Sequence, residues 1–166
     1  MEAGLMSPVH RRAAVVAALL AATASGTGAV QAQAAAPTCR TADLSLSVGQ
    51  VTGGAGSFFH PIRFTNTSAR SCALRGYPGV SVLDSRHRQI GAAASAGPHS
   101  VTTVLVHPAG SVYAAVRTND PSIVDRCRAT STYLRVYPPG NREAVLVPHR
   151  LRVCGAFQVN PVQSTP

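Results

Sequence analysis

Short stretches of alternating apolar and polar residues recur along the chain. In Asp43–Val51, for example, Leu44, Leu46 and Val48 alternate with two serines, which is the two-residue period of a half-buried β-strand. The other strand candidates are Ile62–Thr65, Cys72–Leu74, Val80–Leu83, Val101–Val106, Val112–Val116, Tyr133–Tyr137, Ala144–Val147 and Leu151–Cys154. Turn residues separate these stretches and no long helical period occurs, so the pattern predicts an all-β sandwich of about 8 antiparallel strands.

Two of the turns raise functional alternatives. The glycine-rich segment Thr52–Ser57 could be mistaken for a phosphate-binding loop, but no Gly-Lys-Ser/Thr ending or helical pattern follows it, which favours a flexible turn. Asn66-Thr67-Ser68 matches the sequon for N-glycosylation. The same residue types close hairpins through their side chains, and we expect Asn66–Arg70 to be such a turn.

The amino-terminal residues have the pattern of an export signal. Three basic residues, at positions 10–12, precede the apolar run Ala13–Ala22, which is too short to span a bilayer comfortably. We predict a signal peptide over residues 1–34 with cleavage after Ala34, although cleavage after Ala32 or Ala36 also fits the small-x-small rule. The protein is then secreted or extracytoplasmic and has no transmembrane anchor.

The rest of the chain is expected to form one domain, because its length is too small for a second core. We predict a short linker over residues 35–38, a β-sandwich domain over 39–162 and a tail over 163–166. Chain ends with small and polar residues are commonly poorly ordered. We therefore expect fraying from Asn160 onward.

The four cysteines indicate structural disulfides. Cys39, Cys72, Cys127 and Cys154 are an even set in a chain with an export signal, which is typical of an oxidising compartment. Their separations of 33, 55 and 27 positions contain no close pair of the kind that encloses a zinc ion. Four cysteines allow three connectivities. We prefer Cys39–Cys72 and Cys127–Cys154, because each pair lies where strands close in sequence begin or end.

The charge balance favours anionic partners. The chain has 15 arginines, no lysine and 6 acidic residues. For an exported protein this surface suits an anionic cell-envelope polymer or another exported protein, and nucleic acid is not expected because few aromatic residues accompany the basic ones. A surface that only keeps the protein soluble is the alternative. The candidate anion-binding residues are Arg63, Arg75, Arg86 and Arg88.

No residue pattern indicates catalysis. Serine, histidine and aspartate are present without a Gly-x-Ser-x-Gly motif, and Asp120 and Asp125 lie in a turn-like segment where capping or pairing with Arg126 is the favoured role. Both methionines precede residue 35, and a blue-copper site needs a free cysteine. We therefore predict no catalytic residue, no metal ligand and no cofactor. An imidazole-only metal site would draw on His60, His99, His107 and His149, of which the last two are interpreted as loop residues without a special role.

An ordered set of motifs resembles a known family. The motifs are Phe64–Ser68, Cys72–Val80, Leu134–Gly140 and Val153-Cys154, and together they resemble the secreted actinobacterial family called domain of unknown function 4232 over Cys39–Val162. The resemblance implies an extracytoplasmic immunoglobulin-like β-sandwich with paired cysteines and no established activity. The charged loop Arg86–Arg88 departs from the milder turn expected there.

These observations together predict a non-enzymatic interaction domain of the cell envelope or the secreted fraction. Its ligand is unknown, with docking to anionic envelope polymers through arginines as the sharper form of the hypothesis. A small secreted hydrolase or metal-binding protein is the alternative.

Overall fold

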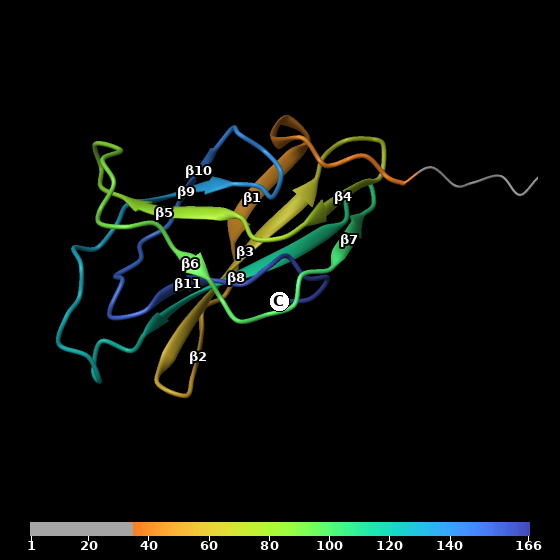
Figure 1. The fold of residues 1–166 in the computed structure, drawn as a ribbon. Helices are drawn as coiled ribbons and strands as arrows, with labels where there is room; N and C mark the ends of the chain where they lie inside the picture. The colour runs from red at the N-terminus through yellow and green to blue at the C-terminus, as the bar shows by residue number, and fades with distance from the viewer. Residues whose placement is uncertain (1–34) are drawn as a thin grey trace, which may run out of the picture. The chain divides into compact units, whose positions relative to one another are not determined.

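Strands make up most of the regular structure in residues 35–166, the part of the chain that this computed structural model describes (Figure 1). The only helical element there is one 3-10 turn, η1 (Thr41–Asp43). The predicted all-β class is confirmed, whereas the predicted signal peptide lies outside the described residues. The strands are β1 (Leu44–Val48), β2 (Thr52–Gly54), β3 (Ser57–Asn66), β4 (Cys72–Arg75), β5 (Gly79–Leu83), β6 (Ser95–Ala96), β7 (Thr103–Val106), β8 (Ser111–Asn119), β9 (Tyr133–Tyr137), β10 (Val145–Pro148) and β11 (Phe157–Val159).

The strands form three sheets. The six-stranded sheet has the order β1–β3–β8–β11–β6, with β2 paired to β3. A three-stranded sheet has the order β10–β9–β5, and β4 pairs with β7 in the third sheet. Every pair is antiparallel except β11 with β6, which run parallel. Two of these pairs, β2 with β3 and β9 with β10, join consecutive strands, which a short connection pairs antiparallel.

β8 shows how the alternating pattern builds the core. Val112 and Val116 are buried, whereas Tyr113 and Ala115 are only half-buried on the opposite face of the strand. Burying a valine-sized side chain stabilises the fold by about 1.5–3 kcal/mol. Inward side chains of both the six-stranded and the three-stranded sheet belong to one hydrophobic core, among them Ile62, Phe64, Val80, Leu134 and Val136.

The segment predicted as a flexible turn, Thr52–Ser57, is a β-hairpin. Gly53 of β2 lies opposite Phe58 of β3, and Ala55 and Gly56 at the tip have φ angles of 47° and 69°. Two successive positive φ angles are the geometry of a type I′ turn, whose twist matches the strands it joins. The predicted strand Ile62–Thr65 is therefore only the second part of the ten-residue strand β3.

The predicted strand at Leu151–Cys154 is not formed. Its backbone bonds irregularly to the segment that follows β8: the amide of Arg128 donates to Val153 O, and the amide of Ser131 donates to Leu151 O. The Ser131 hydroxyl also accepts the Leu151 amide at 3.1 Å. Because a side chain takes the place of a strand partner here, no regular ladder develops.

Both disulfides join the pairs of cysteines preferred from the sequence. Cys39–Cys72 attaches the beginning of the described chain to β4, and Cys127–Cys154 attaches the connection after β8 to the segment before β11. No free cysteine occurs among residues 35–166. The predicted linker also bonds to the domain, since the amide of Ala73 donates to Pro37 O.

Asn66 closes the turn between β3 and β4 from inside the fold. Its side chain is 0% exposed, and its Nδ2 donates to Arg70 O at 2.8 Å and to Val106 O at 3.0 Å. Its Oδ1 accepts the amide of Ser68 at 2.9 Å. The turn role favoured from the sequence is thus confirmed, and both donors of the Asn66 amide are occupied.

Over residues 160–163 the expected fraying is wrong. After β11 the chain continues along β8: the amide of Asn160 donates to Ala115 O, and Tyr113 and Gln163 exchange two backbone hydrogen bonds. Val162 is 0% exposed. Its apolar side chain, together with the buried Pro161 beside it, anchors the segment to the core. No helix among residues 35–166 is long and apolar enough to cross a membrane.

Candidate functional site

The outer face of the six-stranded sheet carries a depression over β3 and β8. Phe59 of β3 and Tyr113 and Ala115 of β8 point to this face, because they alternate with the buried residues of the same strands. The small side chain of Ala115 lies between larger neighbours at this point. An outward alanine between aromatic residues leaves room for a ligand without opening the core.

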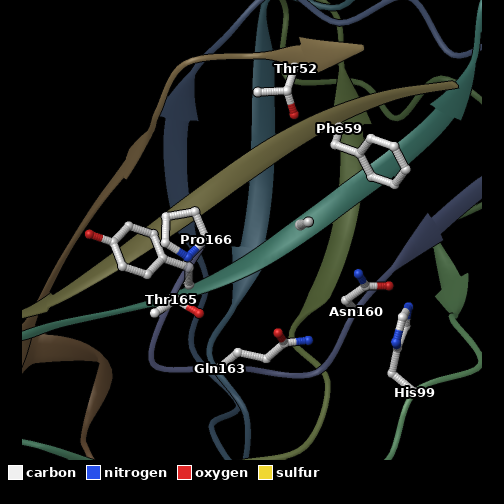
Figure 2. Close-up of a pocket in the computed structure, with 9 residues that line it drawn as sticks. Thr52, Phe59, His99, Asn160, Gln163, Thr165 and Pro166 are labelled. Atoms are coloured by element: carbon white, nitrogen blue, oxygen red, sulfur yellow. The ribbon is translucent and has the colours of Figure 1, made fainter. Parts of the chain in front are cut away.

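We call this depression the sheet groove, and its volume is about 300 Å³. Phe59, Tyr113 and Ala115 are joined in its lining by Thr52 of β2, His99, and four residues of the carboxyl-terminal segment: Asn160, Gln163, Thr165 and Pro166. Figure 2 shows Thr52 and Phe59 on one side of the groove and Asn160, His99 and Gln163 on the other. The volume is at the lower end of the range typical of small-molecule sites.

The polar side chains of the sheet groove have no hydrogen-bond partner in the described part of the chain. This applies to the amides of Asn160 and Gln163, the imidazole of His99 and the hydroxyl of Tyr113. Other amide side chains are used structurally; for example, Asn119 Oδ1 accepts the amide of Ala156 at 2.7 Å. The groove therefore presents donors and acceptors that remain available to a ligand.

The His99 side of the groove is held by Tyr77. The Tyr77 hydroxyl lies 2.8 Å from Gly97 O and 2.7 Å from His99 O, so that it donates to this pair of carbonyls. The amide of Gly97 donates to Val159 O. Gly97 also approaches Asn160 closely, because an added Cβ would lie 2.7 Å from Asn160 Oδ1. The loop carrying His99 is thus fixed against β11 and Asn160.

Tyr77→Phe is expected to lower the free energy of unfolding by about 1 kcal/mol, because the ring stays packed while its hydrogen bonds to two carbonyls are lost. Urea unfolding measures this change, and exchange of the amide hydrogens of Gly97 and His99 is expected to speed up. Tyr137→Phe is the matched control, since the Tyr137 hydroxyl has no partner within residues 35–166. Equal stability of the two variants would contradict the role given to Tyr77.

A second depression, of about 400 Å³, adjoins the sheet groove and shares Thr52, Tyr113 and Pro166 with it. Its lining includes Arg63 of β3, one of the predicted anion-binding residues. Arg63 Nε donates to Ser47 Oγ of β1 at 3.3 Å. Among the described residues the two terminal nitrogens of this guanidinium have no partner.

The structure places the other three predicted arginines elsewhere. Arg75 ends β4 and donates to Thr103 Oγ1 at 3.4 Å. Arg86 and Arg88 lie in the loop after β5, which is at the opposite side of the domain from β4 (Figure 1). The Arg88 guanidinium pairs with Asp84 at 2.8 Å. Backbone and side-chain hydrogen bonds from Arg88 hold the pKa of Asp84 below its ordinary value. The four arginines are not brought together on one face.

His60 and His149 form a pair that sequence reasoning missed. His60 Nδ1 lies 2.9 Å from His149 Nε2, which joins β3 of the six-stranded sheet to the residue after β10 of the three-stranded sheet. Burial, followed by the charge of His149, lowers the pKa of His60 to about 4, and burial also lowers the pKa of His149. His149 is therefore more than a loop residue, which corrects the interpretation made from the sequence.

No group of three or more His, Cys, Asp or Glu side chains gathers closely enough to hold a metal ion in residues 35–166. Asp120 has the capping role favoured from the sequence: its Oδ1 accepts the amide and the hydroxyl of Ser122 at 2.8 Å and 2.7 Å. These hydrogen bonds hold the pKa of Asp120 below its ordinary value. The carboxylate is thus engaged in local structure.

The sequence signal for most of the sheet groove is weak. Tyr113 and Ala115 lie in a predicted strand, and the alternation within it could have placed both on the outer face. Asn160 and Gln163 were assigned to a frayed end, and Phe59 to a region before the predicted strand. Of the lining residues only His99 was named from the sequence, as a possible metal ligand, and Arg63 of the adjoining depression was named as an anion-binding residue.

Comparison with known proteins gives a family and no close relative. The family model described as "Domain of unknown function (DUF4232)" matches residues 39–163. No curated protein matches the chain. Among solved structures, a β-glucosidase from Kluyveromyces marxianus is similar at 9% identity and a TM-score of 0.35, over 70% of this chain and 14% of that one. This chain thus spans a small part of that protein.

Proposed function

The chain belongs to the family described as a domain of unknown function (DUF4232), and on this premise we propose that it is a non-enzymatic, extracytoplasmic binding domain. It holds a cell-envelope polymer in the sheet groove. The observation that carries the proposal is the set of unpaired polar side chains, notably those of Asn160 and Gln163, around the aromatic residues Phe59 and Tyr113.

The lining of the sheet groove supports binding rather than catalysis. Its side chains include no carboxylate, thiol or serine hydroxyl. His99 is its one imidazole, and no hydroxyl lies within hydrogen-bond distance of that ring among the described residues. Hydrolysis by a side-chain nucleophile needs such a contact between nucleophile and base. Ring faces with convergent amides and hydroxyls are instead typical of a recognition site.

The two disulfides support the proposed extracytoplasmic location. Two disulfides persist in an oxidising environment and are rare in the bacterial cytosol. The basic and then apolar amino-terminal pattern favours export and cleavage after Ala34. We also assign the domain an immunoglobulin-like sandwich arrangement, supported by the core that the six-stranded and three-stranded sheets share.

Expression of the full chain in an actinobacterium is expected to yield a product outside the cytoplasm that begins at Ala35. The reason is that the run Ala13–Ala22 is long enough for signal recognition and too short for anchoring. Intact-mass measurement of the fractions tests this result. Val16→Arg is the control, since a charge inside the run should retain the chain in the cytoplasm. A cytoplasmic wild-type product with residues 1–34 intact would contradict the proposal.

Sedimentation with isolated cell walls tests the binding function. We expect the exported protein to sediment with the walls, and Ala115→Phe to reduce the bound fraction at least about tenfold, because the new ring fills the groove. Ala144→Phe adds the same ring at an exposed position before β10 and is expected to bind like the wild type. Thermal unfolding verifies that both variants are folded. Equal wall binding by the two variants would overturn the proposed site.

A further inference from the structure

The sheet groove and the depression beside it form one surface with two kinds of chemistry. They share Thr52, Tyr113 and Pro166, so a ligand that extends past Tyr113 enters both. The first half presents rings and polar side chains, and Arg63 carries the one charged side chain in the lining of the second half. A ligand that fits this surface therefore has an amphipathic part, which lies in the sheet groove, and an anionic part, which lies in the depression beside it.

The first half suits the ring of a sugar. Phe59 and Tyr113 offer flat apolar surfaces, against which the C–H face of a pyranose ring packs. The amides of Asn160 and Gln163 each offer donors and an acceptor, which matches the hydroxyl groups at the edge of such a ring. A volume of about 300 Å³ accommodates one or two sugar units. A purely apolar ligand would leave these amides without partners.

The second half suits an anion. The Arg63 guanidinium is exposed and uses Nε for Ser47 Oγ, which leaves its two terminal nitrogens as a fork for a carboxylate or phosphate. No acidic residue lines either half. By contrast, Arg40 and Arg88 are each paired with an aspartate. Arg63 thus has no acidic side chain as a partner in either half.

We propose that the groove binds an acidic glycan, with one sugar ring between Tyr113 and Asn160 and the carboxylate or phosphate of the adjoining unit on Arg63. This inference rests on the proposed binding function and adds the class of ligand. The carboxylate and the phosphate present the same charge-assisted acceptors to the guanidinium, and separate probes distinguish them.

Titration of the isotope-labelled protein with defined probes, followed by NMR, tests the inference. The anionic sugars are a trimer of galacturonic acid and glucose 6-phosphate; the controls are maltotriose, which is neutral, and polyphosphate, which has no sugar. We expect shifts at the amides of Ala115, Asn160 and Gln163 with an anionic sugar, and binding at least about tenfold tighter than that of maltotriose. The tighter anionic sugar identifies the preferred anion.

Variants separate the two halves. Arg63→Gln is expected to weaken binding of the anionic sugar about tenfold and to leave maltotriose unchanged, because it removes one charge-assisted contact. Arg86→Gln makes the same charge change in the loop after β5 and is expected to alter neither. Ala115→Phe is expected to abolish binding of both sugars.

The outcomes distinguish this inference from the function on which it rests. Polyphosphate binding as tight as that of the anionic sugars, or equal effects of Arg63→Gln and Arg86→Gln, would overturn the acidic glycan. Wall binding that depends on the groove without binding of any sugar would overturn the ligand class and leave the proposed function standing. Absence of both wall and sugar binding would overturn both.

Discussion

Replacing Cys39 and Cys72 together with alanine is expected to lower the free energy of unfolding by about 3–4 kcal/mol. The disulfide closes a loop of 33 positions, and its removal gives the unfolded chain more conformations to occupy. Both cysteines are also buried in the core, where the missing sulfur atoms leave unfilled volume. Against a total stability of about 5–15 kcal/mol for a typical domain, this loss is large.

Urea unfolding of the exported wild type and the double variant measures the difference. The second pair, Cys127 and Cys154, closes a loop of similar length, 27 positions, and its removal is expected to cost nearly as much by the same argument. Ser45→Ala, at an exposed position of β1, is the control and is expected to change stability by less than about 0.5 kcal/mol. A loss below about 1 kcal/mol in the double variant would contradict the role of the disulfide.

Acidification from pH 7.5 to pH 4.5 is expected to lower the free energy of unfolding by about 2–3 kcal/mol through His60. In the fold its pKa is about 4, against 6.5 in a free histidine. Between these values the unfolded chain takes up a proton that the folded chain does not, so stability falls as the pH decreases through this window. The stabilisation is fully present above about pH 7, where His60 is neutral in both states.

Comparison of the wild type with one variant isolates the effect of His60 from other titrations. His60→Leu is expected to remove the contribution of His60 to the pH dependence in this window, because the group that titrates in the unfolded chain is gone, whereas His149, whose pKa burial also lowers, keeps its own contribution. Urea unfolding at the two pH values measures it, and NMR titration of the wild-type imidazole is expected to give a midpoint near 4. An unchanged pH dependence in His60→Leu, or a midpoint near 6.5, would show that the pair with His149 is not buried as described.

Local pattern was sufficient to predict all three strands of the three-stranded sheet, and β1, β8 and part of β3 in the six-stranded sheet, whereas β2, β6 and β11 were missed. The predicted strand Tyr133–Tyr137 has the same bounds as β9. Its alternating pattern and the turn residues on either side are enough to define the strand without contacts from distant parts of the chain. β2 was missed because its glycines have low strand propensity, and it is formed by the type I′ turn and by pairing with β3. The two-residue strand β6 exists only through its parallel partner β11.

The candidate site was harder to predict than the fold, since its parts are distant in sequence. Asn160 reaches the groove only because its amide pairs with Ala115 of β8, and nothing in the local pattern specifies that pairing. The contact between His60 and His149 spans 89 positions. Period-two alternation assigns a face to each residue, whereas the sheet order decides which faces meet.

The buried turn residue Asn66 has a practical consequence for producing this protein. Eukaryotic secretory hosts attach a glycan to Asn-x-Ser/Thr while the chain is still unfolded. Here the modified nitrogen would be the atom that donates to Arg70 O and Val106 O in a side chain that is 0% exposed. A glycan at this position is incompatible with the native turn. Yeast or mammalian secretion would therefore deliver misfolded material, whereas export to a bacterial periplasm combines disulfide formation with an unmodified Asn66.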